Sequence, residues 1–552
     1  MPTIRDLLLA RVDDPNPAMV FEDERWSYAE FIQACADRGA YLLAHRQAGT
    51  FHVGVLLDNV PEYSMWLGAA ALVGATVVGI NPTRRGAELT RDITHTNCQL
   101  IVTDATYRRT LDEPELPIDA DRILEVNSVG WQRDLEPFAG ATIPSSDEIE
   151  VDETSVFLLI FTSGTSGAPK ACICSHGRIA TNGSILAQMM NISENDVLYC
   201  AMPLFHSNAM VTNWTPAIAA GATCVLRRKF SASGFLPDVR RYGVTYFNYV
   251  GKPLAYILLT PEQPDDGDNT LVSGFGNEAT DQDIERFQKR FNCSVTDAYG
   301  STEGGVNVTR TDDMPEGSLG RGLPGVVVLD PETGKLCPPA QFDPQGLLLN
   351  PDEAIGELAN KLGATGFEGY WQNEEASAAR IRDGIYWSGD LAYRDENDFL
   401  FFAGRNSEWL RVDGENFAAA PVERIIARHP AVSVAAVYAV PDEVVGDQVM
   451  AALQLEPGSD FDPQAFDGFL SQQADLGTKW APRYLRICGS LPMTQTNKVL
   501  KRVLRKQRWE CSEPVWWKPE KGAAYRRLEE KDVEAIHRGF ESRGREAALQ
   551  IL

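Results

Sequence analysis

Residues 154–170 read TSVFLLIFTSGTSGAPK, in which an apolar run passes directly into small, hydroxyl-bearing residues, two glycines and a final lysine. The run Val156–Thr162 is typical of a buried β-strand because it is short and rich in branched and aromatic side chains. Glycines let backbone N–H groups approach an anion closely, hydroxyls donate further hydrogen bonds, and Lys170 adds a positive charge. The stretch therefore predicts a strand followed by a phosphate-binding loop, with a nucleotide polyphosphate as its ligand.

Two other interpretations of this loop stay open from its residues alone. The Walker phosphate loop has glycine before its lysine and Ser or Thr after it, whereas Pro169 and Ala171 stand there in this chain. An ordinary surface turn also uses Gly, Ser, Thr and Pro. Residues elsewhere in the chain must decide between a binding loop and a turn.

The length and charge of the chain limit its architecture and partners. A chain of 552 residues predicts a large domain and a smaller one. Its 51 Lys and Arg residues face 77 Asp and Glu residues, a formal charge of -26, which argues against nucleic acid as a partner because DNA and RNA are polyanions. Any anionic ligand must be held by local features.

The N-terminus and the apolar segments predict a cytoplasmic protein without a transmembrane segment. The N-terminus has only four apolar residues between charges, too few for a secretory signal. The stretch Met65–Ile80 is shorter than a bilayer span and predicts a buried helix followed by a buried strand. The ten cysteines show no zinc-site spacing, which favours reduced thiols. Peripheral membrane contact and a homodimer are both compatible with the sequence.

Alternating strand and helix patterns between residues 50 and 330 predict an α/β fold with mixed, largely parallel sheets. The expected strands are Val53–Leu57, Thr76–Ile80, Leu100–Thr103, Val156–Thr162, Thr223–Leu226, Thr245–Val250, Leu271–Gly274 and Ser294–Asp297. The clearest βαβ unit runs from Leu271 to Tyr299. Its helix has Thr280 and Asp283 at capping-box spacing and Ile284, Phe287 and Phe291 on one face.

Two glycine-containing loops are expected in this unit, SGFGNE after its first strand and AYGSTEGG after its second. Ligands of open parallel sheets bind beyond the carboxyl ends of the strands. We therefore expect these two loops and the 163–170 loop to converge on one site.

A small α+β domain is expected after Phe402, on a hinge. Pro421 marks a helix start, Val422, Ile425 and Ile426 form its apolar face, and a strand follows at Val432–Val440. The predicted division is a large domain at 1–403, a mobile small domain at 404–510 and a tail at 511–552 that packs through Trp516 and Trp517.

Five motifs taken in order resemble those of the adenylate-forming superfamily of acyl-CoA synthetases, adenylation domains and luciferases, over nearly the whole chain. They are TSGTSGAPK at 162–170, YGSTE at 299–303, YWSGD at 386–390, Gly404-Arg405, and LPMTQTNK ending at Lys498. The stretches MPLFHS, FNYVG, GNE and VDGEN look most like the branch of very-long-chain acyl-CoA synthetases, fatty-acid transport proteins and steroid-acid CoA ligases. This resemblance implies that a carboxylate attacks ATP to give acyl-AMP and pyrophosphate, and that the CoA thiol then displaces AMP.

The resemblance also implies roles for individual residues. ATP would be held by Thr162, Ser163, Gly164, Thr165, Ser166, Gly167, Lys170, Gly276, Asn277, Glu278, Asp297, Ala298, Tyr299, Gly300, Ser301, Asp390 and Arg405. Within this set Tyr299 would stack on adenine and Asp390 would bind the ribose. Mg²⁺ would be bound by Glu303 with Thr165, since a hard cation prefers oxygen ligands. The catalytic residues would be Lys498, Thr302, Glu303 and His206.

Two of these assignments have plain structural alternatives. A lysine in a basic stretch such as 498–506 is often only a solvated charge, and a lone histidine such as His206 is more often a satisfied core side chain. By the resemblance, Lys498 would reach the bond-forming oxygens and His206 would border the acyl carboxylate. Glu357 is left without a role.

The segment Arg405–Arg411 resembles the hinge about which the small domain turns, which would bring Gly414, Glu415 and Asn416 toward CoA. The chain departs from many relatives at Ser407, where Asp or Lys is common, and at Gln495 and Asn497, where Pro and Gly are common. These departures leave the hinge position and the stiffness of the loop before Lys498 open.

Function keeps two alternatives to a CoA ligase of a hydrophobic carboxylic acid. One is an acyl-AMP ligase that loads a separate carrier protein, and the other is a fatty-acid binding or uptake protein with a vestigial site. Seven residues are expected to line an acyl pocket: Asn208, Ala209, Met210, Trp214, Tyr246, Tyr249 and Val250. Such a lining suits a long-chain fatty acid or a steroid side-chain acid, and ordinary core packing is the alternative for these residues.

Overall fold

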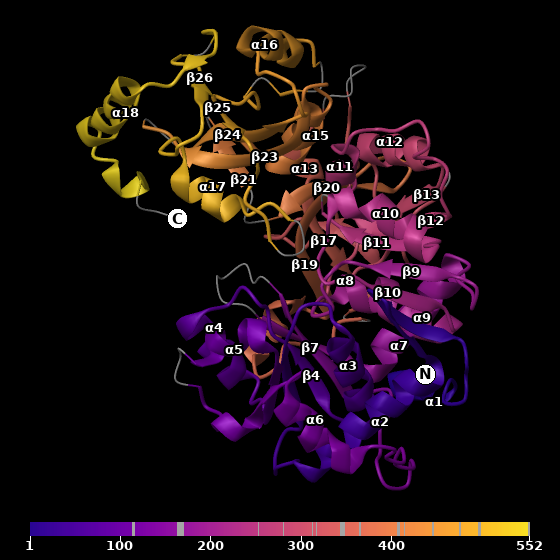
Figure 1. The fold of residues 1–552 in the computed structure, drawn as a ribbon. Coiled ribbons are helices and arrows are strands. Elements are labelled where there is room, and N and C mark those ends of the chain that lie inside the picture. The colour runs from indigo at the N-terminus through magenta and orange to yellow at the C-terminus, as the bar shows by residue number, and fades with distance from the viewer. Residues whose placement is uncertain are drawn as a thin grey trace.

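Three sheets build the large domain of the computed structural model (Figure 1). The structure describes residues 1–549 except for 113–115, 163–169, 252, 280, 312, 316, 343–347, 364–365, 406–408, 413–414, 444–446, 474–475, 478, 495–497 and 521.

The first sheet has the strand order β13-β12-β11-β9-β10-β1-β2 and is parallel except at its edge strand β2. Its strands are β1 (Pro17–Phe21), β2 (Glu24–Ser27), β9 (Val197–Cys200), β10 (Thr223–Leu226), β11 (Tyr246–Val250), β12 (Ser273–Asn277) and β13 (Ser294–Asp297). Parallel strands need crossover connections, and the helices of these crossovers cover the sheet and bury its central strands β9, β10 and β11.

The second sheet has the order β6-β5-β3-β4-β7-β8, and only β8 runs antiparallel. Its strands are β3 (His52–Leu56), β4 (Thr76–Gly79), β5 (Leu100–Thr103), β6 (Ile123–Glu125), β7 (Val156–Thr162) and β8 (Lys170–Ser175). The third sheet is antiparallel, with β14 (Val308–Thr309), β15 (Gly320–Gly322), β16 (Val326–Leu329), β17 (Gly356–Asn360), β18 (Ile381–Arg382), β19 (Ile385–Arg394) and β20 (Phe399–Arg405).

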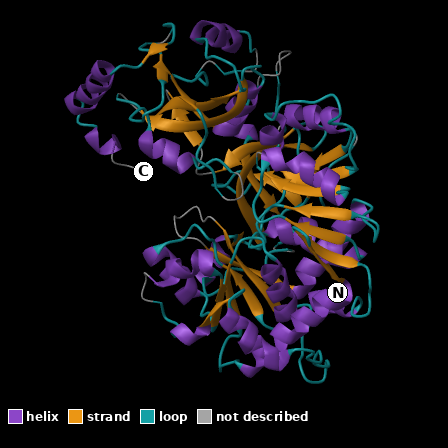
Figure 2. Cartoon of the chain, viewed as in Figure 1, coloured by secondary structure: helices purple, strands orange, loops and turns teal. Residues whose placement is uncertain are grey.

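Helices lie on the faces of these sheets (Figure 2). Those of the large domain are α1 (Ile4–Leu9), α2 (Tyr28–Ala44), α3 (Pro61–Val73), α4 (Gly86–His95), α5 (Ala105–Asp112), α6 (Val129–Leu135), α7 (His176–Met189), α8 (Ser207–Ala209), the π-helical turn η3 (Met210–Trp214), α9 (Thr215–Ala220), α10 (Ala232–Tyr242), α11 (Pro253–Leu258), α12 (Asp281–Phe291), α13 (Pro351–Ala354) and α14 (Glu374–Ala379). The stretch Met65–Ile80 forms the buried end of α3 and then β4, as expected from its apolar sequence.

Two cores pack around the sheet of the small domain, which has the order β23-β24-β25-β26-β27, and the second core also includes Ala255 of α11 in the large domain. The elements of the small domain are β21 (Trp409–Val412), β22 (Glu415–Ala418), α15 (Ala419–Ala427), β23 (Val432–Pro441), β24 (Asp447–Leu455), α16 (Pro463–Ser471), β25 (Tyr484–Cys488), α17 (Lys501–Gln507), β26 (Val515–Trp517), β27 (Arg526–Arg527) and α18 (Glu530–Ser542). The segment 511–552, expected as a tail, thus supplies two strands of this sheet. The α/β class with a small α+β domain is confirmed, whereas the domain boundaries stay a prediction.

The strand at residues 271–277 differs from its expected position. Leu271–Gly274 was predicted, but β12 spans Ser273–Asn277, so the glycines read as loop residues lie inside the strand. A Cβ atom at Gly274 would lie 2.3 Å from the Phe247 ring, and one at Gly276 would lie 2.5 Å from the Tyr249 ring. Glycine in the strand therefore makes room for aromatic side chains of β11.

The helix of this βαβ unit is confirmed on the face that it buries. In α12, Ile284, Phe287 and Phe291 are buried, while Thr280 of the expected capping box lies outside the described residues. Among the described residues, every helix is too short or too polar to cross a bilayer.

Candidate active site

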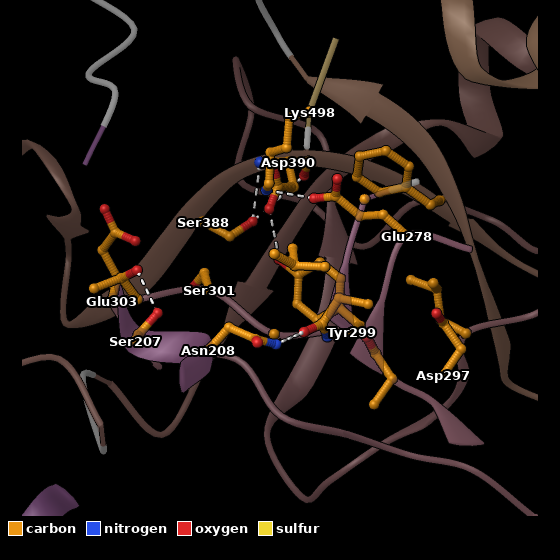
Figure 3. A pocket seen from close by; sticks show the side chains of 18 of the residues that line it. Ser207, Asn208, Glu278, Asp297, Tyr299, Ser301, Glu303, Ser388, Asp390 and Lys498 are labelled. Atoms are coloured by element: carbon orange, nitrogen blue, oxygen red, sulfur yellow. Dashed lines mark hydrogen bonds and ion pairs between the residues drawn. The ribbon is translucent and has the colours of Figure 1, made fainter. Parts of the chain in front are cut away.

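A cavity of about 2630 Å³ lies between the two domains and receives side chains from both. Its walls include Thr162, His206, Asn277, Glu278, Asp297, Ala298, Tyr299, Gly300, Ser301, Thr302, Glu303, Asp390 and Lys498. Figure 3 shows Glu303 on one side of this site, with Glu278, Tyr299 and Asp390 grouped below Lys498. The end of β7, the end of β12 and the turn after β13 therefore meet at one cavity, whereas the loop 163–169 lies outside the described residues.

Glu303 is one of the buried carboxylates of this cavity. Its Oε1 accepts hydrogen bonds from the Thr162 hydroxyl at 3.1 Å and the Tyr370 hydroxyl at 2.9 Å. Arg380 in turn donates to the Tyr370 hydroxyl at 3.2 Å. These hydrogen bonds hold the Glu303 carboxylate in one position at the cavity. A cation bound to an anionic ligand in the cavity could reach it there.

Lys170 begins β8 beside this network. Its ammonium lies 5.2 Å from the centre of the Tyr370 ring, within the range of a cation–π contact. Burial lowers the pKa of Lys170, and the nearby Arg380 guanidinium lowers it further, while Glu303 opposes the shift. Lys170 is thus placed among like and opposite charges, a setting that suits an anionic ligand.

Tyr299 and Asp390 come from different sheets and meet at the cavity. The Tyr299 hydroxyl donates to Asp390 Oδ2 at 2.6 Å, and the Ser388 hydroxyl accepts from the Asp390 backbone N–H at 3.1 Å. Asp390 pairs in register with Arg405 across β19 and β20, as the backbone shows. The hydrogen bond orients the Tyr299 ring, so its face is held in one position at the site.

The end of β12 borders the same space. Asn277 donates its side-chain amide to the Ala298 carbonyl, and its Oδ1 accepts from Asn208 at 3.4 Å. Gly300 and Ser301 line the turn beyond β13, where the Ser301 hydroxyl accepts from the Gly304 N–H at 3.2 Å. These contacts tie the two strand ends together.

Asp297 at the end of β13 is held in a poorly solvated position. Its Oδ2 accepts from the Tyr249 hydroxyl at 2.8 Å and from the Ala279 N–H at 3.0 Å. Burial nevertheless raises the pKa of Asp297 to about 7, since the loss of hydration outweighs these hydrogen bonds. Its carboxyl therefore titrates near neutral pH.

Thr302 and His206 lie at the side of the cavity formed by α8. The Thr302 and Ser207 hydroxyls are hydrogen-bonded at 2.9 Å. The His206 ring packs on Phe205 at 4.7 Å. Burial, together with the Lys498 ammonium, lowers the pKa of His206 to about 3. The imidazole is therefore neutral at pH 7.

Lys498 reaches the cavity from the small domain. Its backbone is paired with Thr494, since Lys498 N donates to the Thr494 hydroxyl at 3.0 Å and Thr494 N donates to the Lys498 carbonyl at 2.7 Å. Its ammonium lies 2.5 Å from Glu278 Oε1 (Figure 3). Lys498 is therefore directed into the site rather than into open solvent.

Several predicted residues fall outside this description. Ser163, Gly164, Thr165, Ser166, Gly167 and Gly414 lie outside the described residues, as do Ser407, Gln495 and Asn497. Arg405, Glu415 and Asn416 are placed only by their backbones, in β20 and β22. Glu303 is consequently the one proposed metal ligand whose surroundings are known.

Comparisons with known proteins bear on the whole chain. Residues 10–371 match the family described as AMP-binding enzyme, and residues 421–498 match its C-terminal domain. The chain belongs to the AMP-binding enzyme family. It is an acyl-CoA synthetase of the adenylate-forming superfamily, with ATP and CoA as substrates.

Two relatives of this AMP-binding enzyme resemble it over most of its length. A steroid-22-oyl-CoA synthetase of Rhodococcus jostii is 48% identical over 552 residues, covering 100% of this chain and 99% of that protein. The medium/long-chain-fatty-acid–CoA ligase FadD17 of Mycobacterium tuberculosis is 46% identical over 516 residues, covering 93% of this chain and 98% of that protein. ATP-bound MatB from Rhodopseudomonas palustris shares the fold, with a TM-score of 0.76 and 23% identity over 91% of this chain and 98% of that one.

Sequence reasoning missed Tyr370 and Arg380 of this AMP-binding enzyme. Both belong to the network around Glu303, and they lie 67 and 77 residues beyond it, so spacing alone gave no signal. Glu357, left without a role, accepts from the Gly389 N–H at 2.7 Å and pairs with Arg382 at 3.3 Å. It therefore supports the turn that presents Asp390.

The expected acyl pocket is only partly correct for this AMP-binding enzyme. Asn208 and Val250 line the cavity. Five others are buried in the core instead: Ala209, Met210, Trp214, Tyr246 and Tyr249. Two of the five have polar atoms with internal partners, since Trp214 donates to Ser64 at 2.7 Å and Tyr246 donates to the Thr212 carbonyl at 2.8 Å. Bulk and apolarity alone did not distinguish core residues from pocket residues.

Proposed function

We propose that this cavity activates a hydrophobic carboxylic acid in two steps. A carboxylate oxygen attacks the α-phosphorus of ATP, forming acyl-AMP and releasing pyrophosphate, and the CoA thiol sulfur then attacks the acyl carbonyl, releasing AMP and a proton. The observation that carries the proposal is that Glu303, the Tyr299–Asp390 pair and Lys498, from three distant segments, line one cavity.

Residue roles follow from where these side chains lie. In this proposal Tyr299 offers its ring to adenine, and Asp390, which accepts a hydrogen bond from Tyr299, also accepts hydrogen bonds from ribose hydroxyls. Lys498 offers a positive charge to phosphate oxygens where negative charge develops. Neutral His206 beside Phe205 borders the acyl group. Arg405 and the 163–170 loop keep the nucleotide roles that the resemblance implies.

Mg²⁺ is proposed as the metal that accompanies ATP. Protein sites for this ion commonly combine one or two carboxylates with substrate phosphates. The buried Glu303 carboxylate, held by Thr162 and Tyr370, fits that donor set. The bound ion would neutralise phosphate charge, and Thr165 remains its second proposed ligand.

Lys498→Ala tests the adenylation role. We expect acyl-AMP formation to slow by roughly 10²–10³-fold, as for the loss of one preorganised electrostatic contact. The measurement is acid-dependent pyrophosphate release. Thioester formation from synthetic acyl-AMP and CoA should survive, because that step does not form the phosphoanhydride. Adenylation at the wild-type rate would disprove the assignment.

The acid is proposed to be a steroid side-chain acid, because a relative that matches the chain from end to end is a steroid-22-oyl-CoA synthetase. A medium- or long-chain fatty acid is the second candidate, supported by the FadD17 ligases. Competition between a steroid-22-oic acid and palmitate, each measured as CoA thioester by mass spectrometry, separates the two. A higher kcat/KM for palmitate would reverse their order.

CoA is proposed as the acceptor, with Gly414, Glu415 and Asn416 turning toward it as the small domain rotates about residues 405–411. Comparing CoA with a phosphopantetheinylated carrier protein tests the carrier-loading alternative. Absence of pyrophosphate with every acid would favour a binding protein with a vestigial site. Peripheral membrane contact, a homodimer and a cytoplasmic location stay predictions.

A further inference from the structure

The small domain is tied to the β12–α12 unit of the large domain by two ion pairs. Glu278, just after β12, pairs with Lys498 at 2.5 Å, and Arg286 of α12 pairs with Glu456, just after β24, at 3.0 Å. The two pairs have opposite polarity, since the large domain supplies an anion to one and a cation to the other. A shift that exchanged partners would bring like charges together.

The backbone at Glu278 shows that this residue is held in an unusual conformation. Its φ of 70° places a non-glycine residue in the left-handed region, which costs about 1–3 kcal/mol and persists only where the surroundings enforce it. Directly before it, Asn277 bonds the Ala298 carbonyl, and directly after it, the Ala279 N–H donates to Asp297 at 3.0 Å. The strand end is thus anchored on both sides of Glu278.

Lys498 is anchored independently of Glu278. Its hydrogen bonds with Thr494 and the bridge between Met493 and Val499 fix its backbone within the small domain. Since both partners of the ion pair have fixed backbones, the pair reports how the two domains are oriented. The Lys498 side chain is 37% exposed and the Glu278 side chain is 47% exposed. A ligand in the cavity can therefore compete for the contact between them.

We infer that Glu278 is a positioning residue, which holds the Lys498 ammonium at the cavity before the nucleotide arrives and yields it to phosphate oxygens afterwards. The Arg286–Glu456 pair holds the same domain orientation from outside the reacting atoms. The inference rests on the proposed function for the transfer to phosphate, but the ion pairs themselves do not depend on it. Screening by salt weakens exposed pairs of this kind.

A carbodiimide crosslink tests the Glu278–Lys498 contact directly, because the reagent joins a carboxylate and an amine in contact with loss of water. We expect an isopeptide between residues 278 and 498 to form in the ligand-free full-length protein at low salt, detected by peptide mass spectrometry. When MgATP is present before the reagent is added, much less of this crosslink should form. The Lys518–Asp467 pair, also 2.5 Å apart but within the small domain, is the internal control and should crosslink equally in both conditions.

Charge reversal tests the second pair, in which Arg286 lies in the wall of the cavity and Glu456 does not. Arg286→Glu and Glu456→Arg should each lower the initial rate of 278–498 crosslinking about two- to fivefold, the range for exposed ion pairs, and the double variant should restore it. Glu278→Gln should lower the rate of adenylation, relative to the rate of thioester formation from acyl-AMP and CoA, by the same two- to fivefold factor. Unchanged rates in both single variants would overturn the role of Arg286–Glu456.

The two proposals fail in different ways. A 278–498 crosslink in a protein that releases no pyrophosphate with any acid would leave the ion pair standing and remove the ligase function. Pyrophosphate release together with the 467–518 crosslink, but with no 278–498 crosslink, would keep the function and overturn the role of Glu278. A crosslink that MgATP leaves unchanged would also overturn it.

Discussion

A single hydroxyl carries much of the support for the Glu303 carboxylate, and a neighbouring tyrosine offers the matched comparison. Tyr370 donates to Glu303 at 2.9 Å. The Tyr386 hydroxyl is buried but has no hydrogen-bond partner among the described residues. The two tyrosines therefore differ in whether the hydroxyl forms a hydrogen bond within the site.

Tyr370→Phe should raise the Mg²⁺ concentration needed for half-maximal adenylation roughly tenfold, since a hydrogen bond to a charged group contributes about 1.5–3 kcal/mol and Thr162 retains its own bond. Pyrophosphate release titrated with Mg²⁺ measures this. Tyr386→Phe should leave the Mg²⁺ dependence unchanged. Equal effects of both substitutions would show that ring packing, not the Tyr370 hydroxyl, matters.

Asp297 makes the stability of the protein depend on pH. Its pKa is raised from 3.8 to about 7 in the folded protein by burial, so the folded state binds a proton that the unfolded state releases. Its contribution to stability is full below about pH 4 and is lost as the pH rises to about 7.

Asp297→Asn removes this titration while keeping the side-chain shape. The Tm of the variant minus that of the wild type should therefore become more positive from pH 5 to pH 8, as measured by calorimetry. The Asn amide can still accept from Tyr249 and Ala279. A Tm difference that is constant across this range would contradict the raised pKa.

The β12 strand shows how much the sequence could predict at the scale of one element. Alternating patterns located β5, β7, β10 and β13 correctly, because their side chains carry the burial signal. They failed at β12, where glycines leave space for rings that belong to β11. The ring contacts are tertiary, so no local pattern could reveal them.

Gly276→Ala should destabilise the large domain by about 1–3 kcal/mol, the usual cost of overpacking, because the new Cβ would lie 2.5 Å from both the Tyr249 ring and its carbonyl oxygen. Nucleotide binding should weaken with it. Gly468→Ala in α16 is the control, since nothing lies within 4 Å there and alanine favours a helix by roughly 0.5–1 kcal/mol. Denaturant unfolding measures both, and a stabilised Gly276→Ala would refute the packing argument.

At the scale of the whole molecule, the motifs predicted which residues gather but not how the domains meet. Glu303, Tyr299, Asp390 and Lys498 were chosen from the resemblance, and all four line the cavity. The contacts of Arg286 with Glu456 and of Glu278 with Lys498 depend on domain orientation. Charges of this kind look like ordinary solvated residues in a sequence.

The role of residues 511–552 was also hidden, because β26 and β27 find their partners only in the folded sheet.

Because each domain has a core of its own, and the core that holds Trp517 reaches the large domain only at α11, the two domains should unfold in separable calorimetric transitions. Trp517 is buried in the small domain and stacks on Tyr484 at 5.9 Å, whereas Trp131 is buried in the large domain. Trp517→Ala should lower the free energy of unfolding of the small domain alone, by about 3–5 kcal/mol. Trp131→Ala should lower that of the large domain alone. As the small domain of Trp517→Ala unfolds first, adenylation should disappear at temperatures where ATP binding persists. A single transition shifted by both variants would mean that the cores unfold as one unit.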